Sequence, residues 1–129
     1  MADLKVPPQN IDAEKSVIAS ILLDKDAILK VAEKLKPTQF YDRKHEMIFE
    51  SILELFEKRS PIDLITLTNQ LTIKDQIKQI GGATYLADLV NFVPTAINIE
   101  SYADIVKENS IRRNLINIAS EISELGFAT

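Results

Sequence analysis

Apolar residues recur every three or four positions along most of this chain, which is the spacing that places side chains on one face of an α-helix. The clearest case is the segment 98–125, which contains neither proline nor glycine. Its apolar positions step by four, three, four and three, so we predict one long helix that ends at Gly126. The apolar stripe on this helix consists of Ile111, Leu115, Ile118, Ile122 and Leu125.

The same predicted helix carries a second apolar row on a neighbouring face. A helix with two such rows has more apolar surface than one short head needs to cover it, so we expect a further surface to pack against it. Burial of one aliphatic side chain contributes about 1.5–3 kcal/mol, and we therefore expect the stripe to mediate self-association, most simply as a homodimer across a two-fold axis. The second row consists of Ile99, Tyr102, Val106 and Ile116.

Shorter apolar repeats before residue 95 predict a set of shorter helices, with asparagine or aspartate as caps and with proline or glycine as breaks. The stretch 61–68 is ambiguous. Its β-branched residues favour a strand, whereas Asp63 as a cap and leucines at helical spacing favour a helix, which we adopt. The predicted helices run from Asn10 to Leu23, from Asp26 to Leu35 before Pro37, from Asp42 to Phe56, from Asp63 to Leu71, from Ile73 to Ile80 before Gly81, and from Tyr85 to Val90 before Pro94.

These elements predict an all-α protein with a compact multi-helix head followed by one long helix. A chain of 129 residues fits one domain, and three glycines with five prolines are too few for a turn-rich β-sandwich. We predict an extended N-terminal arm over 1–9, which includes Pro7 and Pro8, a helical head over 10–94 and the long helix over 95–129.

The composition excludes several kinds of chemistry. The chain has no cysteine and one histidine, so it has no disulfide, no thiolate zinc site and little scope for imidazole catalysis. The net charge of −4 argues against a dedicated nucleic-acid binder. No run of about 18 apolar residues is present, so we expect a cytoplasmic protein without membrane contact.

Two features could hold a ligand, and each has a simpler structural interpretation. Gly81-Gly82 lacks the following lysine of a phosphate-binding loop, so we interpret it as a helix stop and predict no nucleotide site. His45 lies near Asp42 and Glu46, but adjacent helical residues do not face one another and no second histidine or cysteine is available. We therefore predict no metal site and place His45 on a helix surface.

Charged side chains are expected to face solvent, beginning with Glu14 in the first helix. The row of glutamates from 46 to 57 is interpreted as a solvated face on which Glu54 pairs with Lys58. Arg112-Arg113 is the only adjacent arginine pair, and it fits either surface salt bridges or an acidic partner. None of these residues is predicted to be catalytic.

Several short motifs follow one another in a fixed order along the chain. They occupy 7–18, which begins Pro-Pro-Gln-Asn-Ile-Asp-Ala-Glu, and then 22–24, 40–45, 48–49, 60–67, 81–89, 91–94 and 98–106. Together they resemble the N-terminal domain of the bacterial replicative hexameric DNA helicase, the DnaB-type family. The resemblance spans about residues 5–127, and the combination is specific although each motif alone is weak.

The resemblance implies a helical head followed by a helical hairpin, with hairpins that pair between subunits to build the collar of a hexameric ring. The long helix would be the first arm of that hairpin. The returning arm and the RecA-like motor domain, with its ATP and Mg²⁺, would lie outside this sequence. We therefore expect no cofactor and no enzymatic activity in this chain, although the family is one of ATP-dependent DNA helicases.

The resemblance also implies a partner, the C-terminal domain of primase, whose docking couples unwinding to primer synthesis. A helicase loader is a further candidate partner. The three isoleucines of the implied surface would fit packing within the hairpin equally well. Carried over position by position, the primase-binding residues are Tyr85, Ile99, Arg113, Ile116 and Ile122.

Other functions remain as alternatives. The chain could be the related helical domain at the C-terminus of primase, or a generic helical oligomerisation module, but the opening Pro-Pro-Gln-Asn motif favours the helicase. Nucleotide hydrolysis is disfavoured by the missing phosphate-binding loop. Direct binding of single-stranded DNA is disfavoured by the negative net charge and the few aromatic residues.

Overall fold

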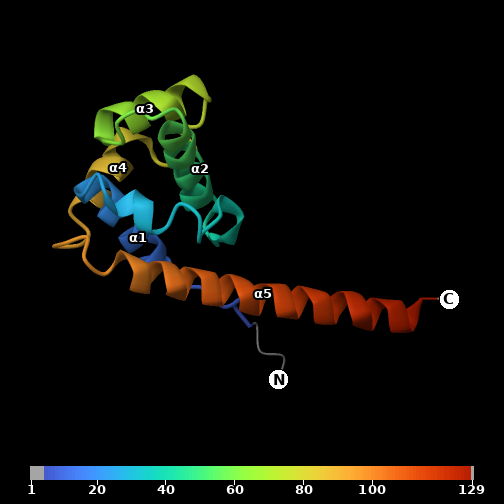
Figure 1. Cartoon of the computed structure of the whole chain (residues 1–129). Coiled ribbons are helices and arrows are strands. Elements are labelled where there is room, and N and C mark those ends of the chain that lie inside the picture. The colour runs from blue at the N-terminus through green and yellow to red at the C-terminus, as the bar shows by residue number, and fades with distance from the viewer. Residues whose placement is uncertain (1–4, 129) are drawn as a thin grey trace.

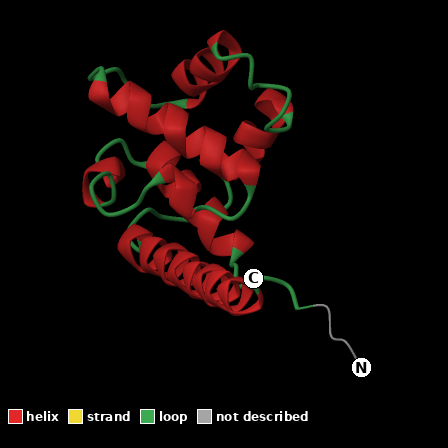
Figure 2. Cartoon of the chain, turned by 90° about the vertical axis from the view of Figure 1, so that its right-hand side faces the viewer, coloured by secondary structure: helices red, strands yellow, loops and turns green. Residues whose placement is uncertain are grey.

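The computed structural model describes residues 5–128, and all regular secondary structure in that range is helical (Figures 1 and 2). The all-α class predicted from the sequence is confirmed. The helices are α1 (Ile11–Leu23), α2 (Arg43–Glu57), α3 (Leu64–Ile73), α4 (Gly82–Val90) and α5 (Ile99–Phe127), with short 3₁₀ turns η1 (Ala27–Lys30) and η2 (Pro37–Gln39) between α1 and α2.

Three of the helices begin at the caps that the sequence predicts. The side chains of Asn10, Asp42 and Asp63 accept hydrogen bonds from backbone N–H groups in the first turns of α1, α2 and α3. Asp63 also exchanges bonds with Thr66, whose hydroxyl accepts the Asp63 N–H at 3.0 Å. These local bonds satisfy N–H groups that a helix cannot pair internally, and they explain why the ambiguous stretch 61–68 becomes helical from Leu64 onward rather than forming a strand.

The core of the head is built around α1, of whose 13 residues eight are buried. Helices α2, α4 and α5 all pack against it. The first turns of α5 belong to this core, because Ile99, Ala103 and Val106 are buried in the same cluster as α1. In Figure 2, which looks nearly along α5, the other helices lie on one side of α5, and Figure 1 shows α5 continuing well past the head.

Two predicted helices are replaced by turns. The segment after Asp26 forms only the short turn η1, and the Asp26 side chain makes no capping bond. The segment 74–80, which follows the end of α3 at Ile73, is irregular because Asp75 adopts a left-handed conformation with φ of 58°. In both segments the apolar positions still supply core residues, such as Ile28 and Ile80, although the backbone is not α-helical.

The end of the long helix also differs from the prediction. Gly126 does not stop α5, which continues to Phe127. A glycine inside a helix costs about 1 kcal/mol relative to alanine, which one terminal turn tolerates. In the part of the chain that is described, no helix combines the length and the apolar character that a membrane span requires.

The core packing predicts a large difference between two isoleucines. Ile48 on α2 is fully buried, whereas Ile65 on α3 is 80% exposed. We expect Ile48→Ala to lower the free energy of unfolding by about 2–5 kcal/mol, because it removes packed atoms and leaves a cavity. The matched substitution Ile65→Ala should change it by less than about 0.5 kcal/mol. Urea denaturation of both variants measures the difference, and equal losses would contradict this description of the core.

Candidate interaction surface

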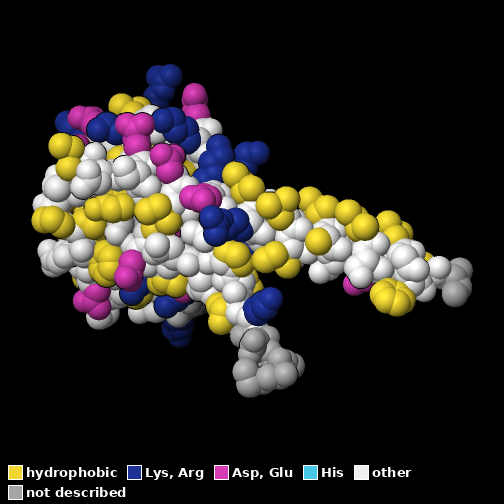
Figure 3. Space-filling model, turned by 90° about the horizontal axis from the view of Figure 1, so that it is seen from below, with side chains coloured by type: hydrophobic (Ala, Val, Ile, Leu, Met, Phe, Trp, Pro, Cys, Tyr) yellow, Lys and Arg dark blue, Asp and Glu magenta, His cyan; other side chains and the backbone are white. Residues whose placement is uncertain are grey.

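The part of α5 beyond the head exposes a continuous row of aliphatic side chains. All five residues of the predicted stripe are on the surface, with exposed fractions between 49% and 74%. Figure 3 shows hydrophobic side chains following the projecting helix, while most charged side chains gather on the head. Such a row is unusual on a helix that remains alone in water, and it marks a surface suited to packing against another protein. Its members are Ile111, Leu115, Ile118, Ile122 and Leu125.

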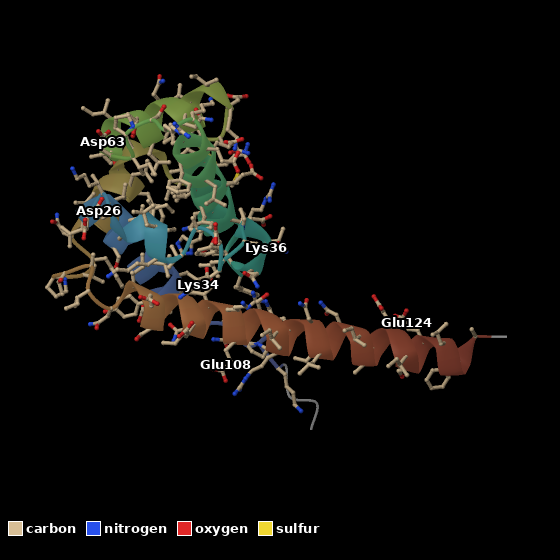
Figure 4. The ribbon with its side chains drawn as sticks, in the orientation of Figure 1. Asp26, Lys34, Lys36, Asp63, Glu108 and Glu124 are labelled. Carbon is tan, nitrogen blue, oxygen red and sulfur yellow. The ribbon has the colours of Figure 1, made fainter. Side chains whose placement is uncertain are left out.

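Few charges interrupt this apolar helix. Residues 114–127 contain two glutamates and neither lysine nor arginine. Arg112 bonds to Glu108 one turn earlier at 3.1 Å, in an exposed pair. Figure 4 places Glu108 and Glu124 on opposite sides of α5. The stripe is therefore flanked by few groups that would have to be desolvated when a partner covers it.

Arg113 has a different role from its neighbour. Its two terminal nitrogens donate to the backbone carbonyls of Pro8, at 2.7 Å, and of Gln39, at 2.8 Å. Its guanidinium carbon lies 5.4 Å from the centre of the Tyr41 ring. The two arginines therefore have different roles. Arg112 makes the surface salt bridge that the sequence allowed, and Arg113 connects the N-terminal arm and the η2 turn to α5 by hydrogen bonds.

A hollow of about 570 Å³ lies between the N-terminal arm and α5. Its lining includes the half-exposed Ile116 and the guanidinium of Arg113. The arm contributes the other wall. This places two of the predicted primase-binding residues side by side, with an aliphatic side chain next to a cation, which is a common composition of interface anchors. The lining residues are Lys5, Val6, Pro7, Arg113, Ile116 and Asn117.

Tyr85, a third predicted primase-binding residue, lies on α4 and is partly buried. Its hydroxyl is 2.6 Å from Nε2 of His45, and the ammonium of Lys44 lies 4.4 Å from the centre of its ring. Burial raises the pKa of Tyr85 to about 12, and the negative charges of Asp42 and Glu14 add to this effect. The phenol therefore keeps its proton at neutral pH and can donate a hydrogen bond.

The structure corrects the expected positions of Glu14 and His45. Neither lies on the surface, since their exposed fractions are 1% and 0%. Glu14 Oε1 is 2.8 Å from His45 Nδ1, and the carboxylate also accepts the backbone N–H groups of Tyr41 and Asp42. Sequence reasoning missed this cluster because it treated charge as a sign of exposure. The spacing does indicate that Glu14 is buried, because Glu14 precedes the buried Ile18 by four residues and so lies on the same face of the helix.

The row of glutamates on α2 is only partly a solvated face. Glu54 does not form the predicted bridge with Lys58. Instead, Glu54 and Glu50 each bond to Lys74 at 2.8 Å, which joins α2 to the end of α3. The Lys74 hydrogen bond lowers the pKa of Glu54. Burial opposes the charge of Lys74, but its hydrogen bonds to the two glutamates outweigh burial and raise its pKa.

The predicted primase-binding residues do not form one patch. Ile99 is fully buried in the core and offers no surface to a partner. Its assignment to the primase-binding surface is therefore corrected. Ile116 and Ile122 are both exposed, but at about 100° per residue they lie roughly a third of a turn apart around α5. Among the described residues, no three His, Asp or Glu side chains lie together in a way that could hold a metal ion.

A helical head that anchors a long helix with an uncovered apolar face defines an interaction domain. Residues 6–108 match the family model described as the DnaB-like helicase N-terminal domain, and the chain belongs to this family. It is 43% identical over 130 residues to the replicative DNA helicase DnaC of Bacillus subtilis, covering 98% of this chain and 29% of that protein. It is 41% identical to the replicative DNA helicase DnaB of Geobacillus stearothermophilus, covering 95% of this chain and 27% of that protein.

Solved structures agree with this assignment. The N-terminal domain of DnaB from Mycobacterium tuberculosis superposes with a TM-score of 0.92 at 39% identity, covering 95% of this chain and 85% of that one. The corresponding domain from Helicobacter pylori, described with its interactions with primase, gives 0.78 at 30% identity and 91% coverage of both chains. The present chain spans less than a third of the length of the curated helicases named above.

The raised pKa of Tyr85 predicts a measurable alkaline transition. A tyrosine in an unfolded chain ionises near pH 10, so the folded state should retain this proton between pH 10 and 12 and lose stability over that range. The chain has three tyrosines and no tryptophan, so ultraviolet absorbance reports tyrosinate directly. We expect an absorbance step near pH 12 that Tyr85→Phe abolishes. A titration curve that loses only a step near pH 10 in this variant would contradict the buried environment.

Proposed function

We propose that this domain is an assembly and docking module of a replicative DNA helicase, which self-associates through α5 and binds the C-terminal domain of primase. The uncovered apolar stripe on α5 carries the proposal, because an exposed apolar row along a helix is typical of a surface that packs against another protein. Support for primase as that partner comes from two similar structures, at 30% and 28% identity, that are described with their interactions with primase.

Self-association follows from the energy of covering the stripe. Its residues are half to three-quarters exposed, and covering the remaining surface of each contributes roughly 1–2 kcal/mol. In a dimer both stripes are covered, and their contribution of roughly 10–20 kcal/mol compares with the roughly 4–15 kcal/mol that association costs in lost translational and rotational freedom. A second copy presents the same stripe, so a symmetric homodimer covers both stripes at once. In the whole helicase this contact would form part of the ring collar.

A charge placed in the stripe should prevent this self-association. We expect the chain to be a dimer or higher oligomer at tens of micromolar, and Leu115→Asp to shift it to a 14.5 kDa monomer in light scattering, because a buried carboxylate without a partner is strongly unfavourable. Ser120→Asp is the matched control, since Ser120 lies on the opposite side of α5 and should leave the oligomer intact. A dimer that survives Leu115→Asp would place the contact elsewhere.

The primase-docking surface is proposed to include Tyr85, Arg113, Ile116 and Ile122, without Ile99. These residues combine an aromatic ring, a guanidinium and two aliphatic side chains, which are typical of residues that dominate binding energy. Ile116 is the most informative of them. It lies beside the hollow at the N-terminal arm and away from the stripe, so its substitution separates primase binding from self-association.

Calorimetric titration of the cognate primase C-terminal domain tests this surface. We expect Ile116→Asp and Tyr85→Ala to weaken the affinity at least tenfold, which corresponds to about 1.4 kcal/mol. Ile65→Asp is the matched control, because Ile65 is an exposed isoleucine on α3. Binding that is unchanged in both surface variants would reject these residues, and absence of binding by the parent chain would reject primase as the partner.

The remaining parts of the proposal concern the whole protein. We propose that unwinding and ATP hydrolysis, with Mg²⁺, are carried out by regions that the much longer relatives have and that this domain acts in the cytoplasm without a cofactor of its own. A helicase loader is a second candidate partner for the same apolar helix. The net charge of −4 supports a protein partner rather than direct contact with DNA.

A further inference from the structure

A chain of short polar contacts begins at Tyr85 and enters the core. The Tyr85 hydroxyl is 2.6 Å from His45 Nε2, and His45 Nδ1 is 2.8 Å from Glu14 Oε1. A carboxylate has no proton to donate, so Nδ1 carries the hydrogen of the second contact. In the neutral imidazole this leaves Nε2 free to accept the phenol O–H. The three side chains come from α4, α2 and α1 and therefore connect three helices.

The same contacts continue from Glu14 toward α5. Glu14 Oε2 accepts the Tyr41 N–H at 2.6 Å, and Oε1 accepts the Asp42 N–H at 3.2 Å, so the carboxylate fixes the backbone where α2 begins. The Tyr41 ring faces the Arg113 guanidinium at 5.4 Å, and Arg113 donates to the carbonyl of Gln39 at 2.8 Å. Tyr85 and Arg113 thus lie at the two ends of one connected series of contacts.

Each hydrogen bond in this series depends on its neighbours, because bulk water cannot reach the core to replace a lost partner. Glu14 and His45 are almost completely buried, and every oxygen and nitrogen of their side chains is paired. Removing one partner leaves a buried polar group without a hydrogen bond, which costs more than the bond itself contributes. A fully paired buried network therefore holds one arrangement of the surrounding helices.

From this geometry we infer that Glu14 and His45 are positioning residues, which hold Tyr85 on α4 and Arg113 on α5 in the relative placement that a docking partner reads. The inference rests on the proposed function. Neither positioning residue touches the partner, since both lie inside the head. The surface around Tyr85 and the surface around Arg113, which are far apart in the sequence, are thereby held rigidly relative to one another.

Nuclear magnetic resonance can test the connection without any partner. The chain has a single histidine, so its imidazole signals are assigned without ambiguity. We expect the spectrum to show a proton on Nδ1, which the contact with the Glu14 carboxylate requires. Tyr85→Phe, which removes one hydroxyl, should change the imidazole signals and also shift the side-chain signal of Arg113. An Arg113 signal that does not respond to Tyr85→Phe would overturn the inference.

Two conservative substitutions at His45 test its contact with Glu14 and its contact with Tyr85 separately. An asparagine amide nitrogen can replace Nδ1 and keep the bond to Glu14, whereas a glutamine reaches the position of Nε2 and keeps the bond to Tyr85. His45→Asn should therefore disturb the Tyr85 signals more than the Arg113 signal, and His45→Gln should disturb the Arg113 signal more than the Tyr85 signals. A role in stability alone predicts the same disturbance at both ends in both variants, and that result would overturn the inference.

Binding of the primase C-terminal domain provides the functional readout. We expect both His45 variants to weaken the affinity about five- to tenfold, the effect of one lost buried hydrogen bond. Leu71→Ala is the control, because Leu71 is fully buried and is not among the linked residues. It should lower stability more but change the affinity less than twofold. If Leu71→Ala weakens binding equally, the inference fails. If the parent chain does not bind primase, the proposed function fails, while the Arg113 signal still decides whether the two ends are coupled.

Discussion

The carboxylate of Glu14 imposes the strongest constraint on the head. A charged group inside a protein requires several hydrogen bonds to replace the water that it has lost. Glu14 obtains them from the backbone at the start of α2 and from His45. Those bonds in turn decide where α2 begins and how it is rotated about its axis. The central helix α1 is thereby connected to α2 by directional contacts as well as by apolar packing, which is not directional.

The sequence predicts the regular parts of this fold because their signals are local. Asn10, Asp42 and Asp63 cap the helices that follow them, and the spacing of apolar residues in 98–125 correctly indicates one long helix. The errors occur where a distant contact decides the structure. The predicted helices at 26–35 and 73–80 have helical spacing, yet each segment needs only to deliver a few side chains to the core, and that does not require an α-helix over its whole length.

The features of the interaction surface also fall into those that the local sequence predicts and those that it does not. Exposure of the α5 stripe could be predicted because its residues recur on one face of the helix, while the other face is enough to pack against the head. The burial of Ile99, the position of His45 and the bonds of Arg113 could not be predicted, because each depends on residues 30 or more positions away, such as Glu14 for His45. A buried hydrogen bond between a glutamate and a histidine leaves only a weak trace in one sequence, because its only sign is a polar residue at a position where the helical period predicts an apolar one.

The rotation of side chains around α5 determines how its two surfaces can be used. Arg113 and Ile116 continue the side of the helix that faces the head and the N-terminal arm, while Ile122 belongs to the stripe that faces away. A second copy that covers the stripe therefore leaves Ile116 free. A partner that contacts both Ile116 and Ile122 must extend about a third of the way around the helix, since each residue turns roughly 100°. A second copy that covers the stripe would compete with such a partner for Ile122 but not for Ile116.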